Sequence, residues 1–212
     1  MPDGGSFAPQ FASVRHRDET AELGMWVFIA TEVLLFGGLL LSYFVYRHIY
    51  PHAFMAASRH TEIGIGSANT AILLTSSFLV ASAVEAFADA RGISRALLAG
   101  AMLLGLLFIG LKGWEYLEEY HEHLVPGLDF AFDGPLADGV ELFFVFYFVA
   151  TALHALHMLI GIGLLATLAL LMRRSGDSRT RTALHSAALY WHFVDVVWIF
   201  LFALIYLPGR SS

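Results

Sequence analysis

Two pairs of polar residues stand three positions apart inside long apolar stretches of the sequence. His154 and His157 form one pair, and His192 and Asp195 form the other. Residues three apart share one face of an α-helix, so each pair projects to one side of its helix. Imidazole side chains in such places can ligate haem, relay protons or make structural hydrogen bonds, and an Asp–His pair can also serve as a general base. The residues alone leave these chemistries open.

The sequence excludes several of the enzymes that such pairs could serve. A hydrolase needs a nucleophile, yet the chain has no cysteine and no serine in a G-x-S-x-G setting. It has no H-E-x-x-H zinc motif either, and the lack of cysteine rules out thiolate zinc sites and iron–sulfur clusters. A haem b site would take His154 or His157 as one ligand and His192 as the other.

A single carboxyl interrupts the first apolar stretch, MWVFIATEVLLFGGLLLSYFVY. Glu32 lies about 12 Å along this segment, at the rise of an α-helix. A carboxyl at such depth is costly, so it is expected to hold a proton, bind a lipid headgroup or hydrogen-bond a neighbouring helix. The structural alternative is a protonated glutamate capped by a serine, threonine or histidine of another helix.

Two further polar groups belong to the second and third apolar stretches. In the third stretch, Lys112 and Glu115 share a helical face, so they can form an ion pair. The alternative is that these residues lie at a solvated helix end among interfacial aromatic residues. The second stretch has a side of small polar residues that predicts helix packing rather than catalysis, at about 0.6 kcal/mol for each hydrogen bond. These residues are Asn69, Thr70, Thr75 and Ser76. We expect no metal site in the chain.

The composition indicates what positions these side chains. Of 212 residues, 58% are hydrophobic and only 14% are charged, which is typical of a membrane protein. Five apolar runs are long enough to cross a bilayer as helices, and strands of a membrane barrel would be shorter and alternating. The sequence therefore predicts an all-α bundle of five transmembrane helices, at about Gly24–Tyr46, Gly64–Ala88, Arg95–Leu117, Glu141–Met172 and Leu184–Leu207. The fourth run is long, so its helix must tilt or extend beyond the membrane.

Arginine and lysine positions predict the orientation of the bundle. One side collects most of the cations, namely Arg15, Arg17, Arg91, Arg95, Arg173, Arg174, Arg179 and Arg181. The other side has Arg47, Arg59 and Arg210, and an acidic loop from Glu118 to Asp138. The positive-inside rule then places the N-terminus in the cytoplasm and the C-terminus outside. We divide the chain into a polar cytoplasmic tail (1–23), the five-helix domain (24–208) and a short tail (209–212). A net charge of -6 does not suggest nucleic-acid binding.

Five sequence motifs, one from each apolar run and in a fixed order, carry a family resemblance. They are WVFIATE with the following FGG, NTAILLTSS, GWEYLEE, HALHMLIG and YWHFVDVVWIFLF. Together they resemble subunit III of the haem–copper oxidases, the cytochrome c oxidase subunit 3 family, from about Gly24 to Pro208. Ala152 stands where the family usually has glycine before its two histidines. Longer members have two additional helices ahead of these five.

The resemblance implies a supporting role without redox chemistry of its own. It implies a five-helix bacterial subunit III of an aa3- or caa3-type oxidase in the cytoplasmic membrane, in contact with subunit I and in one complex with subunit II. Haems and copper would belong to those partners, and this chain would bind phospholipid. Glu32 matches a glutamate associated with bound lipid and with the entrance to the proton path of the catalytic subunit. His154 and His157 would be framework or lipid-contacting residues without a metal.

Three other functions remain compatible with the sequence. A quinol oxidase subunit III would look much the same, and a related accessory protein of nitric oxide reductase is a second alternative. The third is a stand-alone haem b cytochrome. In any of these, we expect His192, Asp195 and one histidine of the fourth helix to form a buried network, because unpaired polar groups are costly in lipid.

Overall fold

The structure, a computed structural model, describes residues 14–127, 130–132, 134–174 and 178–210. Its described residues contain helices and no strand, as predicted. The elements are α1 (Val14–Ile49), α2 (Pro51–His60), α3 (Ile63–Ala86), α4 (Arg91–His121), α5 (Ala137–Arg174), α6 (Ser178–Ile205) and the 3₁₀ turn η1 (Pro208–Arg210).

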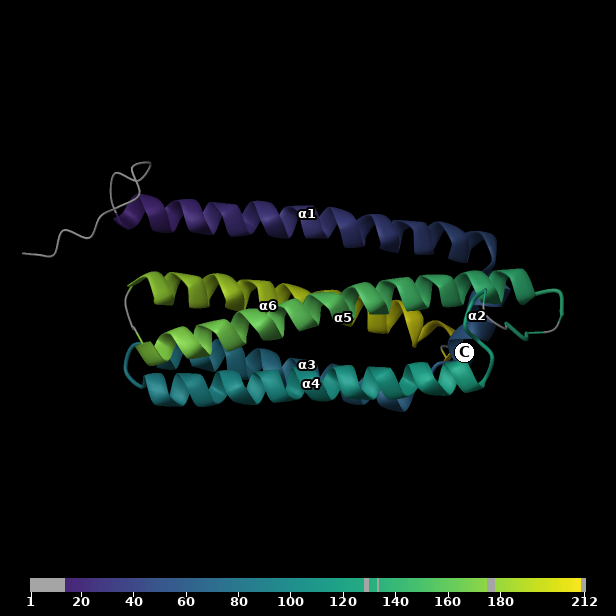
Figure 1. Cartoon of the computed structure of the whole chain (residues 1–212). Helices are drawn as coiled ribbons and strands as arrows, with labels where there is room; N and C mark the ends of the chain where they lie inside the picture. The colour runs from purple at the N-terminus through teal and green to yellow at the C-terminus, as the bar shows by residue number, and fades with distance from the viewer. Residues whose placement is uncertain (1–13, 128–129, 133, 175–177, 211–212) are drawn as a thin grey trace, which may run out of the picture.

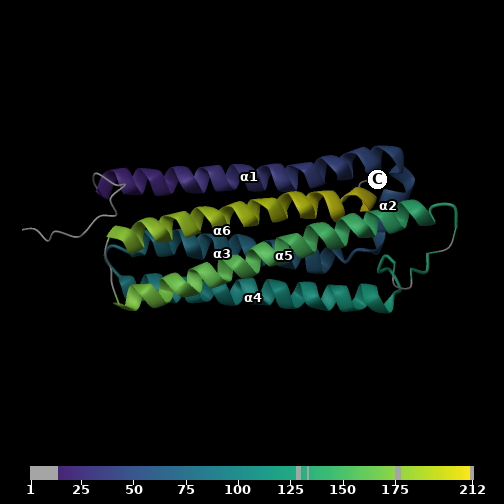
Figure 2. The same ribbon diagram turned by 45° about the horizontal axis from the view of Figure 1, so that its top comes forward.

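The five long helices lie side by side, and those that follow one another along the chain run in opposite directions (Figures 1 and 2). The starts of α1, α4 and α6 and the ends of α3 and α5 gather at one end of the bundle. The short α2, the α4–α5 connection and the C-terminus gather at the other (Figure 1). Three arginines at helix ends therefore share the first end: Arg91 at the start of α4, Arg173 near the end of α5 and Arg179 near the start of α6.

Each predicted span corresponds to one long apolar helix. Within the described residues, five helices are long and apolar enough to cross a membrane, and α5 is the longest of them. The boundaries differ from those predicted. Helix α1 begins at Val14, inside the predicted polar tail, and α4 continues past Leu117 to His121. The acidic segment predicted as a loop from Glu118 therefore begins with the last turn of a helix.

The short helix α2 was not predicted, because ten residues of mixed polarity give no membrane signal. Pro51 occupies its first turn, where the fixed φ of proline favours a helix start. Its buried face includes Ala53 and Phe54, which pack toward α5. A Cβ at Gly139 of α5 would lie only 2.5 Å from the Ala53 Cβ, so the two helices approach closely because this position is a glycine.

Helix α2 also anchors the end of the chain. Ser58 Oγ donates to the Ile205 carbonyl at 2.7 Å, and Arg59 Nε donates to the Gly209 carbonyl at 2.9 Å. A Cβ at Gly209 would lie 2.6 Å from the Met55 carbonyl oxygen, a separation that real side chains do not adopt. The residues that we assigned to a short tail therefore include Gly209 as a buried contact, whereas 211–212 lie outside the described residues.

Helix α6 is the most enclosed of the five spans: 50% of the residues in its most apolar stretch are buried, compared with 11% in α1. Trp191 connects α6 to three helices. Its indole Nε1 donates to Ser76 Oγ of α3 at 3.1 Å. Its ring also lies against Gly105 of α4 and Gly161 of α5, where a Cβ would come within 3.0 Å of ring atoms. Small residues on three helices therefore make the space that this indole fills.

The small polar residues of α3 differ in the hydrogen bonds that they make. Thr70 and Ser76 accept hydrogen bonds from Trp198 and Trp191 of α6, each at 3.1 Å, which is the packing role expected of them. Thr75 is exposed and its hydroxyl bonds only the Ala71 carbonyl of its own helix. The amide of Asn69 is buried and has no hydrogen-bond partner among the described residues.

Candidate functional site

The carboxyl of Glu32 meets an imidazole of another helix. Glu32 Oε2 of α1 lies 3.0 Å from His157 Nε2 of α5, and the two side chains are 14% and 9% exposed. The other ring nitrogen, His157 Nδ1, lies 2.8 Å from the Leu153 carbonyl one turn earlier in α5. Both nitrogens of the ring are therefore engaged, one within α5 and one across to α1.

The hydrogen bonds of His157 fix the number of protons in this pair. A backbone carbonyl can only accept, so His157 Nδ1 carries a hydrogen. The contact between Nε2 and Glu32 then holds one further proton, on the imidazole as an ion pair or on the carboxyl as a neutral pair. The two groups thus form an acid–base couple inside the bundle, which can hold a proton or pass it on.

Aromatic side chains surround the Glu32–His157 pair. The Phe36 ring of α1 lies edge-on to the imidazole with centroids 5.2 Å apart, and the Tyr190 ring of α6 stacks against it at an interplanar angle of 28° with centroids 6.5 Å apart. Tyr190 also donates its hydroxyl hydrogen to the His157 carbonyl at 2.9 Å. These contacts hold the imidazole toward α1 and keep most water away from the pair, which strengthens the interaction between its members.

A second cluster surrounds Lys112 of α4, and we call Lys112, Glu115, Tyr147 and Tyr206 the lysine cluster. Lys112 Nζ lies 3.0 Å from Glu115 Oε2, so the ion pair that the spacing made available is formed. The same ammonium donates to Tyr147 at 2.7 Å and to Tyr206 at 2.8 Å. Tyr206 donates in turn to Glu115 Oε1 at 2.7 Å. The cluster joins α4, α5 and the end of α6.

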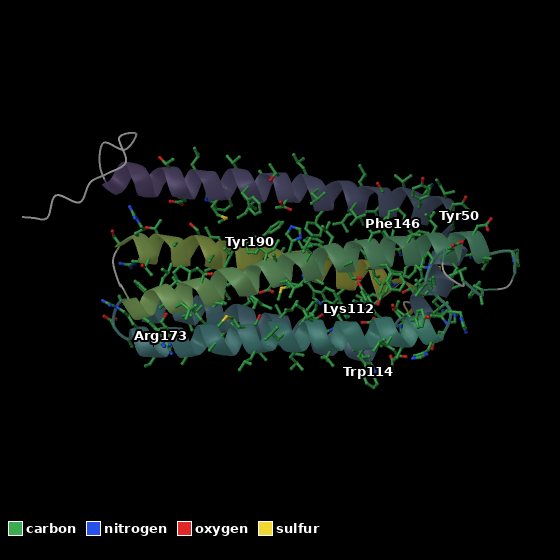
Figure 3. The ribbon with its side chains drawn as sticks, in the orientation of Figure 1. Tyr50, Lys112, Trp114, Phe146, Arg173 and Tyr190 are labelled. Carbon is green, nitrogen blue, oxygen red and sulfur yellow. The ribbon has the colours of Figure 1, made fainter. Side chains whose placement is uncertain are left out.

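The lysine cluster is not the solvated helix end that we kept as an alternative. The side chains of Lys112 and Glu115 are only 3% and 1% exposed. The ammonium lies 4.2 Å from the centroid of the Tyr147 ring, within range of a cation–π interaction. Figure 3 places Lys112 among the helices and nearer the end that holds Tyr50, whereas Trp114 points away from the bundle. The three N–H donors of the ammonium are all used, as a buried cation requires.

The remaining histidine of α5 lies in an aromatic setting. His154 Nε2 lies 3.1 Å from the Val194 carbonyl of α6, and its ring packs against Phe108 and Trp198 with centroids 5.3 and 5.1 Å away. Because the carbonyl accepts, Nε2 carries the hydrogen and Nδ1 is the acceptor. His154 is thus a framework contact between α5 and α6.

The network that we expected around Asp195 does not form. His192 Nδ1 lies 2.6 Å from Ser77 Oγ of α3, rather than bonding Asp195 or a histidine of α5. Both carboxyl oxygens of Asp195 are buried and make no well-formed hydrogen bond among the described residues, and Ser77 is the polar side chain that lies near the carboxyl. The sequence could not foresee this, because residues three apart share a face but the partner depends on how α3, α5 and α6 are rotated against one another.

The same geometry does not favour a haem between these histidines. His157 is engaged by Glu32 and Leu153, His154 turns to a carbonyl of α6, and His192 turns to α3. A di-histidine site needs two imidazoles that face one another across a space for the porphyrin. Within the described residues, no group of three or more histidine or acidic side chains is placed to hold a metal ion.

The fold and the buried polar groups define a multi-pass membrane bundle, and comparison with known proteins gives its family. Residues 13–210 match the family described as cytochrome c oxidase subunit III. The chain is 33% identical over 192 residues to "Cytochrome c oxidase subunit 3" of Thermostichus vulcanus, covering 89% of this chain and 87% of that protein. It is 30% identical over 213 residues to "Quinol oxidase subunit 3" of Bacillus spizizenii, covering 99% and 97%. The chain therefore belongs to the cytochrome c oxidase subunit III family, the third subunits of haem–copper oxidases.

Several residues of these clusters escaped the sequence analysis. Tyr147 and Tyr206 lie in apolar runs, where a tyrosine is common and does not indicate a functional site. Their positions in the sequence also do not relate them to Lys112. Glu119 was taken as part of a loop, whereas it is buried in the last turn of α4. The detectable signal was the run of glutamates from Glu115 to Glu122, which is unusually acidic for the end of a membrane span.

Proposed function

We propose that this chain is the non-redox subunit III of a bacterial cytochrome c oxidase of the aa3 or caa3 type. In this proposal it packs against the haem-bearing subunit I, beside subunit II, and supports proton uptake and stable turnover during oxygen reduction coupled to proton pumping. The relative from Thermostichus vulcanus, named as a cytochrome c oxidase subunit, supports the choice of electron donor. Haem and copper belong to the partner subunits.

The observation that carries the role in proton uptake is the Glu32–His157 pair. It holds one proton between a carboxyl and an imidazole, inside a membrane-spanning segment and mostly shielded from water. Ionisable residues in such positions are expensive and usually serve ion or proton pathways. The pair lies where the outermost helix, α1, meets α5. A neighbouring subunit against α1 would therefore be close to this proton.

The orientation and lipid contacts belong to the same proposal. Arginines at the start of α4, the end of α5 and the start of α6 lie at one end of the bundle, and the positive-inside rule assigns that end to the cytoplasm. The N-terminus then lies inside and the C-terminus outside. Large apolar side chains such as Leu34, Leu41 and Phe44 are exposed along α1. We assign phospholipid chains and subunit I to this surface.

A quinol oxidase subunit III is the second candidate. The relative from Bacillus spizizenii covers nearly all of this chain and is itself nearly all covered, so the two proteins have the same extent. The two candidates share the fold and the Glu32–His157 pair, and they differ in the electron donor of the complex. A partner subunit II with a binuclear copper centre would indicate cytochrome c as the donor.

Replacing Glu32 tests the proposed role. In the assembled oxidase, Glu32→Ala should leave the haem content close to that of the wild type. It should slow proton uptake several-fold and shorten the period of sustained turnover, because the couple loses the carboxyl that shares the proton. The measurements are stopped-flow proton uptake and oxygen consumption followed to inactivation.

Glu85→Ala is the matched control, because this glutamate of α3 is exposed. It should behave as the wild type in both assays. A Glu32→Ala oxidase with wild-type proton uptake and wild-type lifetime would refute the role of the pair, while leaving the family assignment intact.

A further inference from the structure

A pocket of about 370 Å³ opens beside the lysine cluster, at the end of the bundle that holds α2. Its lining includes five glutamates and two histidines, and no lysine or arginine among the described residues. The glutamates come from the last turns of α4 and from the α2–α3 junction, and they are Glu62, Glu115, Glu118, Glu119 and Glu122. Carboxylates concentrated in one concave surface attract cations and protons from solution.

One of these carboxyls differs from the rest. Glu119 is 4% exposed, and both of its carboxyl oxygens are buried without a hydrogen-bond partner among the described residues. The Lys112 ammonium and the Tyr147 hydroxyl lie near it, and the hydroxyl makes only a weak contact with the carboxyl, outside the geometry of a well-formed hydrogen bond. Glu118, one position earlier, instead accepts a hydrogen bond from the exposed Trp114 at 2.7 Å. The pocket thus has two buried carboxyls at its inner side, Glu115 within the lysine cluster and Glu119 outside it, and more exposed carboxyls around them.

The charges around Glu119 can neutralise one buried anion, Glu115, but not a second one at Glu119. Lys112 is the cation of the lysine cluster, and Glu115 already neutralises it at 3.0 Å. An ionised Glu119 would add an uncompensated negative charge next to that pair, and burial of an unpaired charge is strongly unfavourable. The charged and titratable groups around it come from all the surrounding elements: Lys112, Glu115, Glu118 and His121 of α4, Glu122 just after α4, Tyr147 of α5, Tyr206 after α6, and His60 and Glu62 across the pocket.

We propose that Glu119 is a proton-binding site that exchanges its proton with water through the acidic pocket. The burial of its carboxyl, its lack of a well-formed hydrogen bond and the neutral Lys112–Glu115 pair beside it favour a bound proton. The pocket supplies the route to water. This site is separate from the Glu32–His157 pair and does not depend on the role proposed for that pair.

Infrared difference spectroscopy of the full chain in lipid nanodiscs tests the proposal. Glu119→Gln should remove one carbonyl-stretch band of a protonated carboxylic acid at neutral pH, because glutamine keeps the shape without the acid. In the wild type, transfer to deuterated buffer should shift the same band, since the pocket lets its proton exchange. Glu118→Gln is the matched control and should remove only a carboxylate band. If Glu119→Gln also removed a carboxylate band, or if the acid band persisted in this variant, the proposal would be wrong.

Stability provides a second readout that does not depend on spectral assignment. If Glu119 is neutral, Glu119→Gln preserves charge and shape and should unfold at the same denaturant concentration as the wild type. If Glu119 were instead an anion that supports Lys112, the variant would unfold at a distinctly lower concentration, which would overturn the proposal.

Discussion

Replacement of Lys112 by methionine should destabilise the bundle by about 3–5 kcal/mol, the usual cost of leaving one member of a buried ion pair alone. Methionine keeps the length of the side chain, so packing changes little. Glu115 then loses the ammonium at 3.0 Å, and the hydroxyl oxygens of Tyr147 and Tyr206 lose their donor. The measurement is the free energy of unfolding of the chain in detergent, from a denaturant titration followed by circular dichroism.

Two controls separate this loss from a general effect of the substitution. Arg91→Met removes an exposed cation from the same helix and should change the stability little, within about 0.5 kcal/mol. The double variant Lys112→Met with Glu115→Gln removes both charges and should recover a large part of the lost stability, because no unpaired ion remains. If Lys112→Met alone unfolded with the wild-type midpoint, the lysine cluster would not be a buried ion pair.

Truncation of Trp191 to alanine should cost about 3–5 kcal/mol, as is usual for large-to-small substitutions in a close-packed interior. The indole fills a space bounded by Gly105 and Gly161 and donates to Ser76, so alanine leaves a cavity between four helices and an acceptor without its donor. These neighbours are glycine and serine, whose small side chains cannot expand into the cavity. Thermal unfolding of the purified chain measures the loss.

The matched control is Trp114→Ala. Trp114 is 61% exposed, and its indole bonds Glu118 on the surface of α4. Its removal should therefore leave the stability of the isolated chain nearly unchanged. Equal losses from the two tryptophans would contradict the packing of α6 described above.

The sequence predicted those features of the fold that depend on a long apolar stretch within one segment of the chain. Long apolar stretches gave the five spans, because the bilayer imposes a minimum length on a helix that crosses it. Helix α2 has no such constraint, and only Pro51 and a short buried face mark it. The continuation of α4 to His121 was missed because the predicted span ends with the apolar run at Leu117, whereas the helix continues through the polar residues that follow.

The sequence identified which polar residues belong to the candidate site, but it did not predict which of them contact one another across helices. Periodicity put Lys112 and Glu115 on one face, and this contact needs only one helix. The partner of Glu32 comes from a helix more than a hundred residues later in the chain, and the rotation of α1 and α5 decides that it is His157. The rotation of α6 against α3 and α5 likewise leaves Asp195 without the histidine partner that we expected. Contacts between helices depend on how the helices pack together, and the periodicity of a single helix gives no information about that packing.

The central claim is that this chain serves as the third subunit of a haem–copper oxidase without redox chemistry of its own. Affinity purification of the tagged chain from its native membrane, with mass spectrometry and a reduced-minus-oxidised spectrum, tests it most directly. We expect a haem-bearing subunit I and a subunit II to co-purify, and the haem signal to vanish when this chain is separated from them. A chain that purifies alone, or that keeps its own haem spectrum after separation, would contradict the account.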